Sequence, residues 1–222
     1  MTDVITIDGP AGSGKSTVSR LLAKKINCLY LDTGAMYRAV ALAASRKGIS
    51  FSDGKRLGEL CRSLELYFTT DADPPRLFLG KEDISVPIRT PDMDMLSSEV
   101  SAVKEVREAM MELQRKMARG ISIVAEGRDM GTVVFPEARH KFFLTASPEV
   151  RAERRYKEMV GRGESVSKEI VEAKLRKRDH QDKTRLLAPL KPATSAKLID
   201  STKLTPDEIV RDILKDLKKR NA

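Results

Sequence analysis

Nine residues near the start of the chain have the types and spacing of a phosphate-binding loop. The pattern is Gly, four residues, then Gly-Lys-Ser, which matches G-x-x-x-x-G-K-[ST]. The residues are Gly9, Pro10, Ala11, Gly12, Ser13, Gly14, Lys15, Ser16 and Thr17. In such a loop backbone N–H groups point at the phosphates, a lysine reaches the terminal phosphates, and a hydroxyl ligates Mg²⁺. We therefore expect Lys15 to contact ATP and Ser16 to bind the metal.

The residues on either side of this loop give the motif the context that it needs. Residues 4–7 form an apolar run that predicts a buried strand, and Val18, Leu21, Leu22 and Ile26 recur at helical spacing. A strand followed by a glycine-rich loop and a helix puts the positive end of the helix dipole beside the phosphates. A glycine-rich turn with one exposed lysine is the alternative, and it leaves these flanking patterns unexplained.

Arginine and aspartate follow two further predicted strands. Residues 32–38 come after the apolar run 29–31, residues 126–131 come after the run 121–125, and a third charged group, residues 178–185, ends a basic segment. Ligands of open α/β sheets bind at the carboxyl ends of the strands. Phosphoryl transfer needs guanidinium groups around the donor and acceptor phosphates, because their charges repel. These groups therefore predict an acceptor site.

Within the three groups, five residues could bind an acceptor nucleotide. Arg38, Arg128 and Arg185 are candidates for its phosphate, and Asp129 and Asp182 could accept hydrogen bonds from its nucleoside. The alternative is that each forms an exposed ion pair on a charged helix, which contributes little to stability. For Arg128 and Asp129, which are flanked by glycines at a strand end, we favour the functional interpretation.

The elements that must position these residues predict an α/β fold of the P-loop NTPase type. The five predicted strands are residues 4–7, 29–31, 121–125, 141–145 and 197–199. Residues 64–89 hold short apolar pieces between turn residues, which predicts two or three antiparallel strands in an inserted subdomain. A Val- and Met-rich stripe predicts one helix from near Ser98 to Gly120. A capping box at residues 205–208 predicts the start of the last helix.

Composition restricts where the protein works. The chain has 222 residues, of which 33% are charged and 41% hydrophobic, as expected of a globular domain. No apolar run approaches the roughly 18 residues of a membrane span, and a strand predicted from residue 4 leaves no room for a secretion signal. The two cysteines, Cys28 and Cys61, stand alone, which is typical of a reducing compartment. We expect a monomer in the cytoplasm.

The formal charge of +9 raises the question of what the chain binds. More than half of this excess lies between Arg151 and Arg185. Aromatic residues make up 5% of the chain and Trp is absent, which argues against a surface that stacks nucleic-acid bases. Small polyphosphates are therefore the better candidates. A nucleotide-dependent RNA-binding module is the alternative, which salt-dependent RNA binding without phosphoryl transfer would support.

Four motifs make the chain resemble the bacterial cytidylate kinases, or CMP kinases, of the nucleoside monophosphate (NMP) kinase group. They are I-D-G-P-A-G-S-G-K-S, L-D-T-G-A-M-Y-R, E-G-R-D-M-G-T-V-V-F-P and R-D-H-Q-D-K-T-R-L-L-A-P-L. The likeness runs from residue 4 to about residue 201. It implies ATP-dependent phosphorylation of CMP and dCMP with Mg²⁺, in pyrimidine nucleotide metabolism. A kinase for UMP or another small acceptor is the alternative.

The resemblance also implies an organisation for the chain. One kinase domain, residues 1–222, would contain a five-stranded parallel sheet in a core of residues 1–37, 120–150 and 186–222. Residues 38–119 would form the NMP-binding region, with a small antiparallel insertion at about 64–90. Residues 151–185 would form the lid.

The family's functional residues carry over to matching positions. The positions that would read cytosine are Ser98, Arg107 and Asp129. Those that would hold the CMP phosphate are Arg38, Arg128 and Arg185. Those around the ribose are Thr33, Arg178 and Asp182. The lid arginines that would close over ATP are Arg154 and Arg155. The residues implied in catalysis are Lys15, Arg128, Asp129, Arg154, Arg155 and Arg185. A carboxylate at Asp129 suits the amine of cytosine, whereas uracil presents a carbonyl there.

Overall fold

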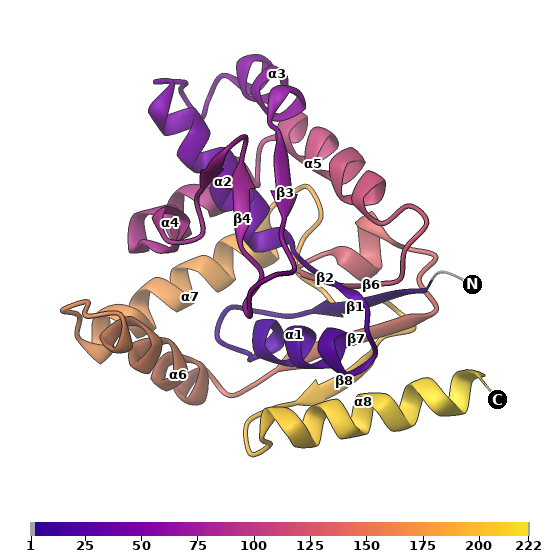
Figure 1. The fold of residues 1–222 in the computed structure, drawn as a ribbon. Helices are drawn as coiled ribbons and strands as arrows, with labels where there is room; N and C mark the ends of the chain where they lie inside the picture. The colour runs from indigo at the N-terminus through magenta and orange to yellow at the C-terminus, as the bar shows by residue number, and fades with distance from the viewer. Residues whose placement is uncertain (1–2, 222) are drawn as a thin grey trace. The chain divides into compact units, whose positions relative to one another are not determined.

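The computed structural model describes residues 3–221, together with their side chains except those of Pro91, Arg220 and Asn221 (Figure 1). The chain divides into two compact units. The first unit is Met1–Leu29 with Ile121–Ala222, and the second unit is Tyr30–Gly120. Residues 1, 2 and 222 of the predicted kinase domain lie outside the described residues. No helix within residues 3–221 has both the length and the apolar character needed to cross a membrane.

A five-stranded sheet with the spatial order β2-β6-β1-β7-β8 confirms the predicted α/β fold. Its strands are β1 (Val4–Asp8), β2 (Leu29–Asp32), β6 (Ile123–Gly127), β7 (His140–Thr145) and β8 (Lys197–Asp200). Strand β1 pairs in parallel with β6 and β7, and β7 pairs in parallel with β8. The third predicted strand begins two residues later than expected, because Ile121 is exposed whereas β6 is buried throughout.

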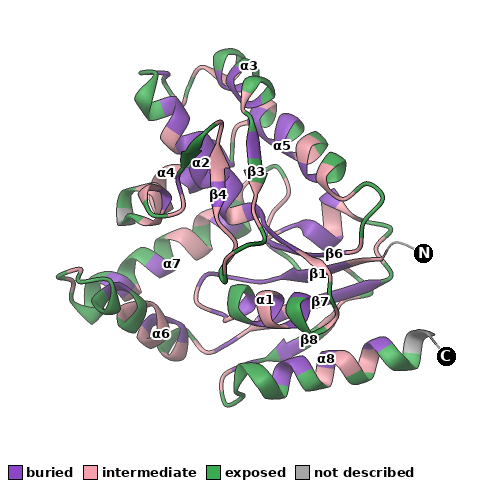
Figure 2. Cartoon of the chain, viewed as in Figure 1, coloured by how far each residue is buried: buried purple, intermediate pink, exposed green. Residues whose placement is uncertain are grey.

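The helices of the first unit are α1 (Lys15–Lys25), α6 (Pro148–Gly161), α7 (Lys168–Thr184) and α8 (Pro206–Asn221), and one π-helical turn, η2, spans Met130–Val134. Helix α1 packs against β1, β6 and α8, and α6 packs against α7. Figure 2 shows buried residues along β1, whereas α8 turns an exposed face to solvent. The predicted capping box is confirmed: the Thr205 N–H donates to Glu208 Oε2 at 2.8 Å, and the Glu208 N–H donates to Thr205 Oγ1 at 3.3 Å.

A small apolar cluster joins the P-loop to the two helices α6 and α7. Ala11 packs there with Ala152 and Met159 of α6 and with Val171 and Leu175 of α7. These side chains come from two segments that are far apart in the sequence, and burying them together helps to order the loop that precedes α1. The helix pair that carries the predicted lid is therefore anchored on the P-loop at this cluster.

The second unit is mostly helical. Its helices are α2 (Thr33–Arg46), α3 (Gly54–Ser63), α4 (Pro91–Val100) and α5 (Lys104–Met117), with a 3₁₀ turn η1 at Pro87–Arg89. Strands β3 (Leu66–Phe68), β4 (Leu77–Leu79) and β5 (Glu82–Asp83) form an antiparallel sheet in that order, as predicted.

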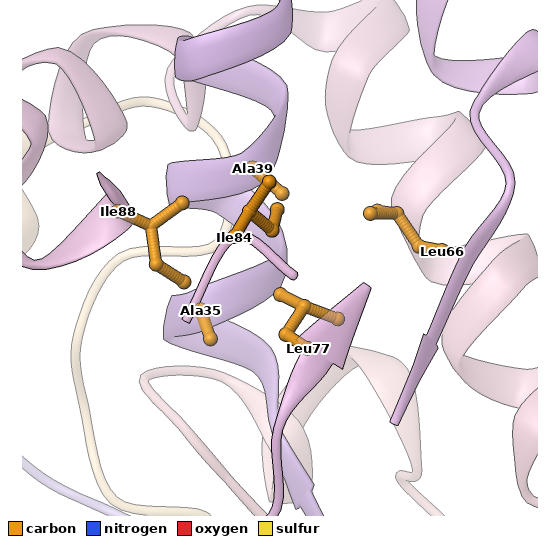
Figure 3. Packing of buried hydrophobic residues seen from close by; sticks show 6 residues of the cluster. All are labelled: Ala35, Ala39, Leu66, Leu77, Ile84 and Ile88. Atoms are coloured by element: carbon orange, nitrogen blue, oxygen red, sulfur yellow. The ribbon is translucent and has the colours of Figure 1, made fainter. Parts of the chain in front are cut away.

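Apolar side chains fasten this small sheet to α2. Leu66 and Leu77 of the sheet pack with Ala35 and Ala39 of α2 and with Ile84 and Ile88, as Figure 3 shows. The alanines let the larger side chains approach the helix closely. The insertion is therefore an integral part of the second unit's core.

The prediction of one helix from near Ser98 to Gly120 was wrong, because the chain breaks it at residues 101–103. Helix α4 ends at Val100, and Val103 takes an extended conformation before α5 begins. The Ser101 hydroxyl donates to the Ser98 carbonyl at 2.8 Å, and the Arg107 guanidinium donates to the Ser101 carbonyl at 3.2 Å. Side chains that bond to the backbone in this way compete with the helical hydrogen bonds.

Candidate active site

The P-loop connects β1 to α1 and has the backbone that phosphate binding requires. Gly14, just before the helix, has a φ of +84°, a left-handed conformation that favours glycine. Lys15 is buried, and its Nζ donates to the Pro10 carbonyl at 3.2 Å. The ammonium group thus lies over the loop that it would serve. Ser16 is exposed in the first turn of α1, where its hydroxyl is accessible to a ligand.

Two arginines of α6 donate hydrogen bonds to backbone carbonyl groups of the P-loop. Arg151 donates from NH1 to the Ala11 carbonyl at 3.1 Å and from NH2 to Asp179 Oδ2 of α7 at 2.6 Å. Arg154 donates from NH1 to the Ser13 carbonyl at 3.5 Å and from NH2 to the Ser201 carbonyl at 2.7 Å. These bonds occupy loop carbonyls with cationic donors, and they add positive charge beside the predicted phosphate site.

The two predicted lid arginines have different surroundings. Arg154 contacts the P-loop directly, and the Ser201 hydroxyl joins the same network by donating to the Ser13 carbonyl at 2.8 Å. Arg155 donates from NH1 to Glu158 Oε2, on the same helix, at 2.7 Å. Arg151, Asp179 and Ser201 were not among the predicted site residues. Their local spacing gives no sign of these contacts, because each contact joins residues that are far apart in the sequence.

The carboxyl end of β6 lies beside the start of the P-loop. Because β1 and β6 are parallel and Asp8 is paired with Gly127, the residues that follow each strand emerge together. Those residues are Gly9 of the loop and Arg128, with Asp129 next in sequence. The sheet register thus brings the predicted donor loop and two predicted acceptor residues to one edge of the first unit.

Four predicted site residues form a charge cluster at this edge. Arg128 Nε donates to Asp182 Oδ2 at 2.8 Å. Arg185 lies between the two carboxylates, with NH2 3.7 Å from Asp129 Oδ1 and NH1 3.9 Å from Asp182 Oδ1. Arg185 also donates from Nε to the Ala188 carbonyl at 2.8 Å, which orients the guanidinium. All of these side chains are mostly buried, so their charges act in a partly desolvated site.

The cluster keeps its members charged. Burial favours the neutral form of Asp182, but Arg128, Arg178 and Arg185 outweigh it and lower the pKa of this carboxyl. Burial likewise opposes the charge on Arg128, and the neighbouring Asp182 and Glu126 raise its pKa above the ordinary value. Arg178, predicted near the ribose, thus belongs to the same electrostatic group as Asp182. Two carboxylates and several guanidiniums in one place can bind an anion together with hydrogen-bond donors of a nucleoside.

Asp8, which was not among the predicted site residues, is the last residue of β1. Its Oδ1 accepts the Met130 N–H at 2.9 Å, and its Oδ2 accepts the Gly131 N–H at 2.8 Å. Burial raises the pKa of Asp8 to about 7, although these two N–H groups act in the opposite direction. Its position could have indicated a special role, because it is a carboxylate at the end of an otherwise apolar predicted strand.

The second unit gathers charges around the start of α2. Asp32 caps this helix by accepting the Ala35 N–H at 2.8 Å, and it accepts a bond from Arg89 NH2 at 3.0 Å. Arg38, a predicted phosphate ligand, has NH2 3.8 Å from Asp32 Oδ2 and NH1 3.5 Å from Asp94 Oδ1. Burial favours protonation of Asp32, but Arg89 and Arg38 outweigh it and lower its pKa to about 2. Arg38 is thus held in place by two carboxylates.

The other predicted residues of the second unit are also buried. Thr33 begins α2, Ser98 lies in the last turn of α4, and Arg107 lies in the first turn of α5. The Arg107 guanidinium lies 5.8 Å from the centroid of the Tyr37 ring, a cation–π arrangement, and it donates to the Ser101 carbonyl. The break between α4 and α5 therefore orients the arginine that the sequence predicts to read the base. Asp94 and Arg89, which contact Arg38 and Asp32 around the start of α2, were not among the predicted site residues.

Comparisons with known proteins point to one family. The profile described as cytidylate kinase matches residues 5–219. A cytidylate kinase of Citrifermentans bemidjiense is 48% identical over 99% of this chain and 94% of its own length. A cytidylate kinase of Mycobacterium leprae is 46% identical over 100% of this chain and 99% of its own length.

Similarity in structure supports the fold. A crystal structure of an uncharacterized protein from Eubacterium ventriosum covers 98% of this chain and 99% of its own, with a TM-score of 0.54 and 14% sequence identity. At that identity the likeness bears on the fold alone. The sequence matches, by contrast, span nearly the whole chain at close to half identity, and they agree with the P-loop and the charge cluster described above. This chain therefore belongs to the cytidylate kinase family.

Proposed function

We propose that this protein transfers the γ-phosphoryl group of ATP to CMP, giving ADP and CDP, and that dCMP is a second acceptor. The observation that carries the proposal is the pairing of Asp8 with Gly127, because it puts the P-loop next to the Arg128–Asp129 pair. A phosphoryl donor and a phosphate acceptor must be held close together and in line. Family membership names the acceptor as CMP.

We assign the donor side to the P-loop. Backbone N–H groups of residues 11–17 and the N-terminus of α1 hold the ATP phosphates, with Lys15 at the terminal ones. Ser16 fits a magnesium ligand, since its hydroxyl is exposed at the first turn of α1 and Mg²⁺ prefers oxygen ligands completed by phosphates and water. The bound ion would neutralise phosphate charge. Of the two lid arginines, Arg154 is the better candidate for ATP, because its guanidinium contacts the loop itself.

We assign roles in acceptor binding to residues of each unit in turn. In the first unit, Arg128 and Arg185 bind the CMP phosphate, Asp129 reads the cytosine amine, and Arg178 and Asp182 hold the ribose. In the second unit, Arg38 binds the phosphate, Thr33 contacts the ribose, and Ser98 and Arg107 read the base. The support for these roles is that the structure keeps the arginines charged and oriented by carboxylates or carbonyls.

The chemistry needs positioning and charge stabilisation rather than a general base. The attacking atom is an oxygen of the CMP phosphate, whose second pKa is near 6, so it is already ionised at neutral pH. Lys15, Arg128 and Arg185 then stabilise negative charge that spreads over the transferred group. We propose that residues 151–185 act as a lid that excludes water and so suppresses ATP hydrolysis, and that residues 38–119 form the NMP-binding region.

The remaining assignments concern the working state of the enzyme. We propose a monomer in the cytoplasm, with ATP and CMP as small-molecule partners and no nucleic acid. Both cysteines are free thiols, which suits a reducing compartment. Light scattering after gel filtration should give a mass close to 24.7 kDa; twice that value would contradict the monomer.

The experiment that tests the function measures ADP release with CMP, dCMP and UMP in turn, with and without Mg²⁺, for the wild type and two variants. Arg185→Ala should raise KM for CMP by about tenfold, roughly 1.4 kcal/mol of lost binding, while KM for ATP stays within about twofold. Arg176→Ala is the matched control, because this arginine of α7 is 72% exposed and pairs with Glu172. A tenfold preference for UMP over CMP would overturn the assignment.

A further inference from the structure

We propose that Asp8 is a positioning residue: it holds η2, the turn that directly follows Arg128 and Asp129, in register with the P-loop. The proposal deepens the function proposed above, and its consequence for CMP rests on that function. It gives Asp8 no contact with substrate. Asp8 instead acts through the backbone of the residues that follow Asp129.

The geometry links the two halves of the site through one side chain. Asp8 directly precedes Gly9, the first residue of the P-loop, and Met130 directly follows Asp129. Both carboxylate oxygens of Asp8 are used, one by the Met130 N–H at 2.9 Å and the other by the Gly131 N–H at 2.8 Å. Any displacement of the turn relative to β1 must stretch one of these bonds.

The turn itself has an irregular backbone that needs such support. Asp129 has φ −145° and ψ 20°, outside the helical region, and η2 then follows as a single π-helical turn. The Val134 N–H donates to the Asp129 carbonyl at 3.2 Å, and the Phe135 N–H donates to the Met130 carbonyl at 2.7 Å. Single π-helical turns are rare in proteins, and those that occur are often found at functional sites. Here the two N–H groups at the start of the turn are bound by Asp8.

Close packing supports the same interpretation. A Cβ added to Gly131 would lie 2.9 Å from Thr6 Oγ1 and 3.4 Å from Asp8 Oδ2, so the turn rests directly on β1. Asp8 itself is only 3% exposed. Burying a carboxylate away from water is unfavourable. A buried carboxyl with both oxygens bonded to backbone N–H groups is typical of a side chain that holds the backbone in place, not of one that contacts solvent.

The test compares Asp8→Asn with the wild type. An asparagine offers one oxygen and one NH₂ group, so one of the two backbone N–H groups would face a donor. We expect KM for CMP to rise by about tenfold and KM for ATP to stay within about twofold. Asp53→Asn is the matched control, because Asp53 also accepts a backbone N–H, from Arg56 at 3.0 Å, but at the start of α3 in the second unit. It should leave both KM values unchanged.

A second variant keeps the proposal testable if Asp8→Asn does not fold. Gly131→Ala leaves the carboxyl intact but forces the turn away from Thr6, and it should also raise KM for CMP more than KM for ATP. Equal rises in both KM values, in either variant, would overturn the proposal in favour of general support of the sheet.

Amide hydrogen exchange separates this inference from the proposed function. In folded Asp8→Asn, the Met130 and Gly131 amides should exchange at least tenfold faster than in the wild type, whatever the acceptor proves to be. Unchanged exchange at both amides would refute the positioning role even if CMP is the substrate. Faster exchange in a protein that does not phosphorylate CMP would instead refute only the proposed function.

Discussion

The Nε atom of Arg128 lies 2.8 Å from Oδ2 of Asp182. This hydrogen bond connects the residue after β6 to helix α7. The two residues are 54 positions apart in the sequence, and both side chains are mostly buried. One belongs to the sheet edge beside the P-loop, and the other belongs to the basic helix pair. The contact therefore ties the proposed phosphate ligand to the proposed lid, and each residue keeps the other charged.

This pair should show strong energetic coupling. In a double-mutant cycle with Arg128→Ala and Asp182→Ala, we expect a coupling energy of about 1–3 kcal/mol in the free energy of unfolding measured with urea. The reason is that removing one partner leaves a buried charge without its counter-ion. The Glu172–Arg176 pair on α7 is the control, and as an exposed pair it should give about 0.3–0.5 kcal/mol. Equal coupling in the two cycles would contradict a stabilising role for the buried pair.

Replacing Asp129 should weaken discrimination between CMP and UMP. Asp129→Ala removes the carboxylate proposed to accept the cytosine amine, so kcat/KM for CMP should fall by about tenfold or more while that for UMP changes little. Steady-state kinetics with both acceptors measures this. Asp129 also lies 3.7 Å from Arg185. If both acceptors lose activity by the same factor, its role is to hold Arg185 and not to read the base.

The two lid arginines should differ in their effect on ATP. Because Arg154 donates to the Ser13 carbonyl of the P-loop and Arg155 donates to Glu158, Arg154→Ala should raise KM for ATP by about tenfold and Arg155→Ala by less than about threefold. Each variant serves as the other's control, since both remove one guanidinium from α6. The reverse order would show that Arg155 reaches ATP once the nucleotide is bound.

Acid should weaken the protein through Asp32. Its pKa in the folded state is about 2, below the ordinary value of 3.8, because Arg89 and Arg38 outweigh the effect of burial. A carboxyl with a lowered folded pKa contributes stability that is fully present above about pH 4 and is lost as the pH falls towards 2. Urea unfolding at pH values from 2 to 6 should show a fall in stability that Asp32→Asn reduces by about 2 kcal/mol. A variant with the same slope as the wild type would contradict this.

Much of the fold could be predicted from the sequence, because local patterns carry it. Short apolar runs predicted the five parallel strands, and turn residues predicted the antiparallel insertion. The error was the helix from near Ser98 to Gly120. Its apolar stripe continues through residues 101–103, so periodicity alone predicts no break. The break arises from hydrogen bonds of Ser101 and Arg107 to backbone carbonyls, which a one-dimensional pattern does not reveal.

The site residues also fall into those that the sequence could predict and those that it could not. Lys15, Ser16, Arg128 and Asp129 were found in the sequence because they lie in short motifs at strand ends, and the family of the chain follows from such motifs. The residues that hold the P-loop and the turn after Asp129 in place were not found. Asp8, Arg151 and Asp179 contact residues far away in the chain, and their spacing carries no signal of those contacts.

The sequence by itself determined that a phosphate-binding loop is present, that the fold is a parallel α/β sheet, and which family the chain resembles. These follow from residue types at fixed local spacing. Only the tertiary structure decided which carboxylate orients which arginine, and that Asp8 bridges the P-loop to the turn after Asp129. Such choices depend on strand register and helix packing, which bring together residues up to 188 positions apart and set the charge of side chains through burial.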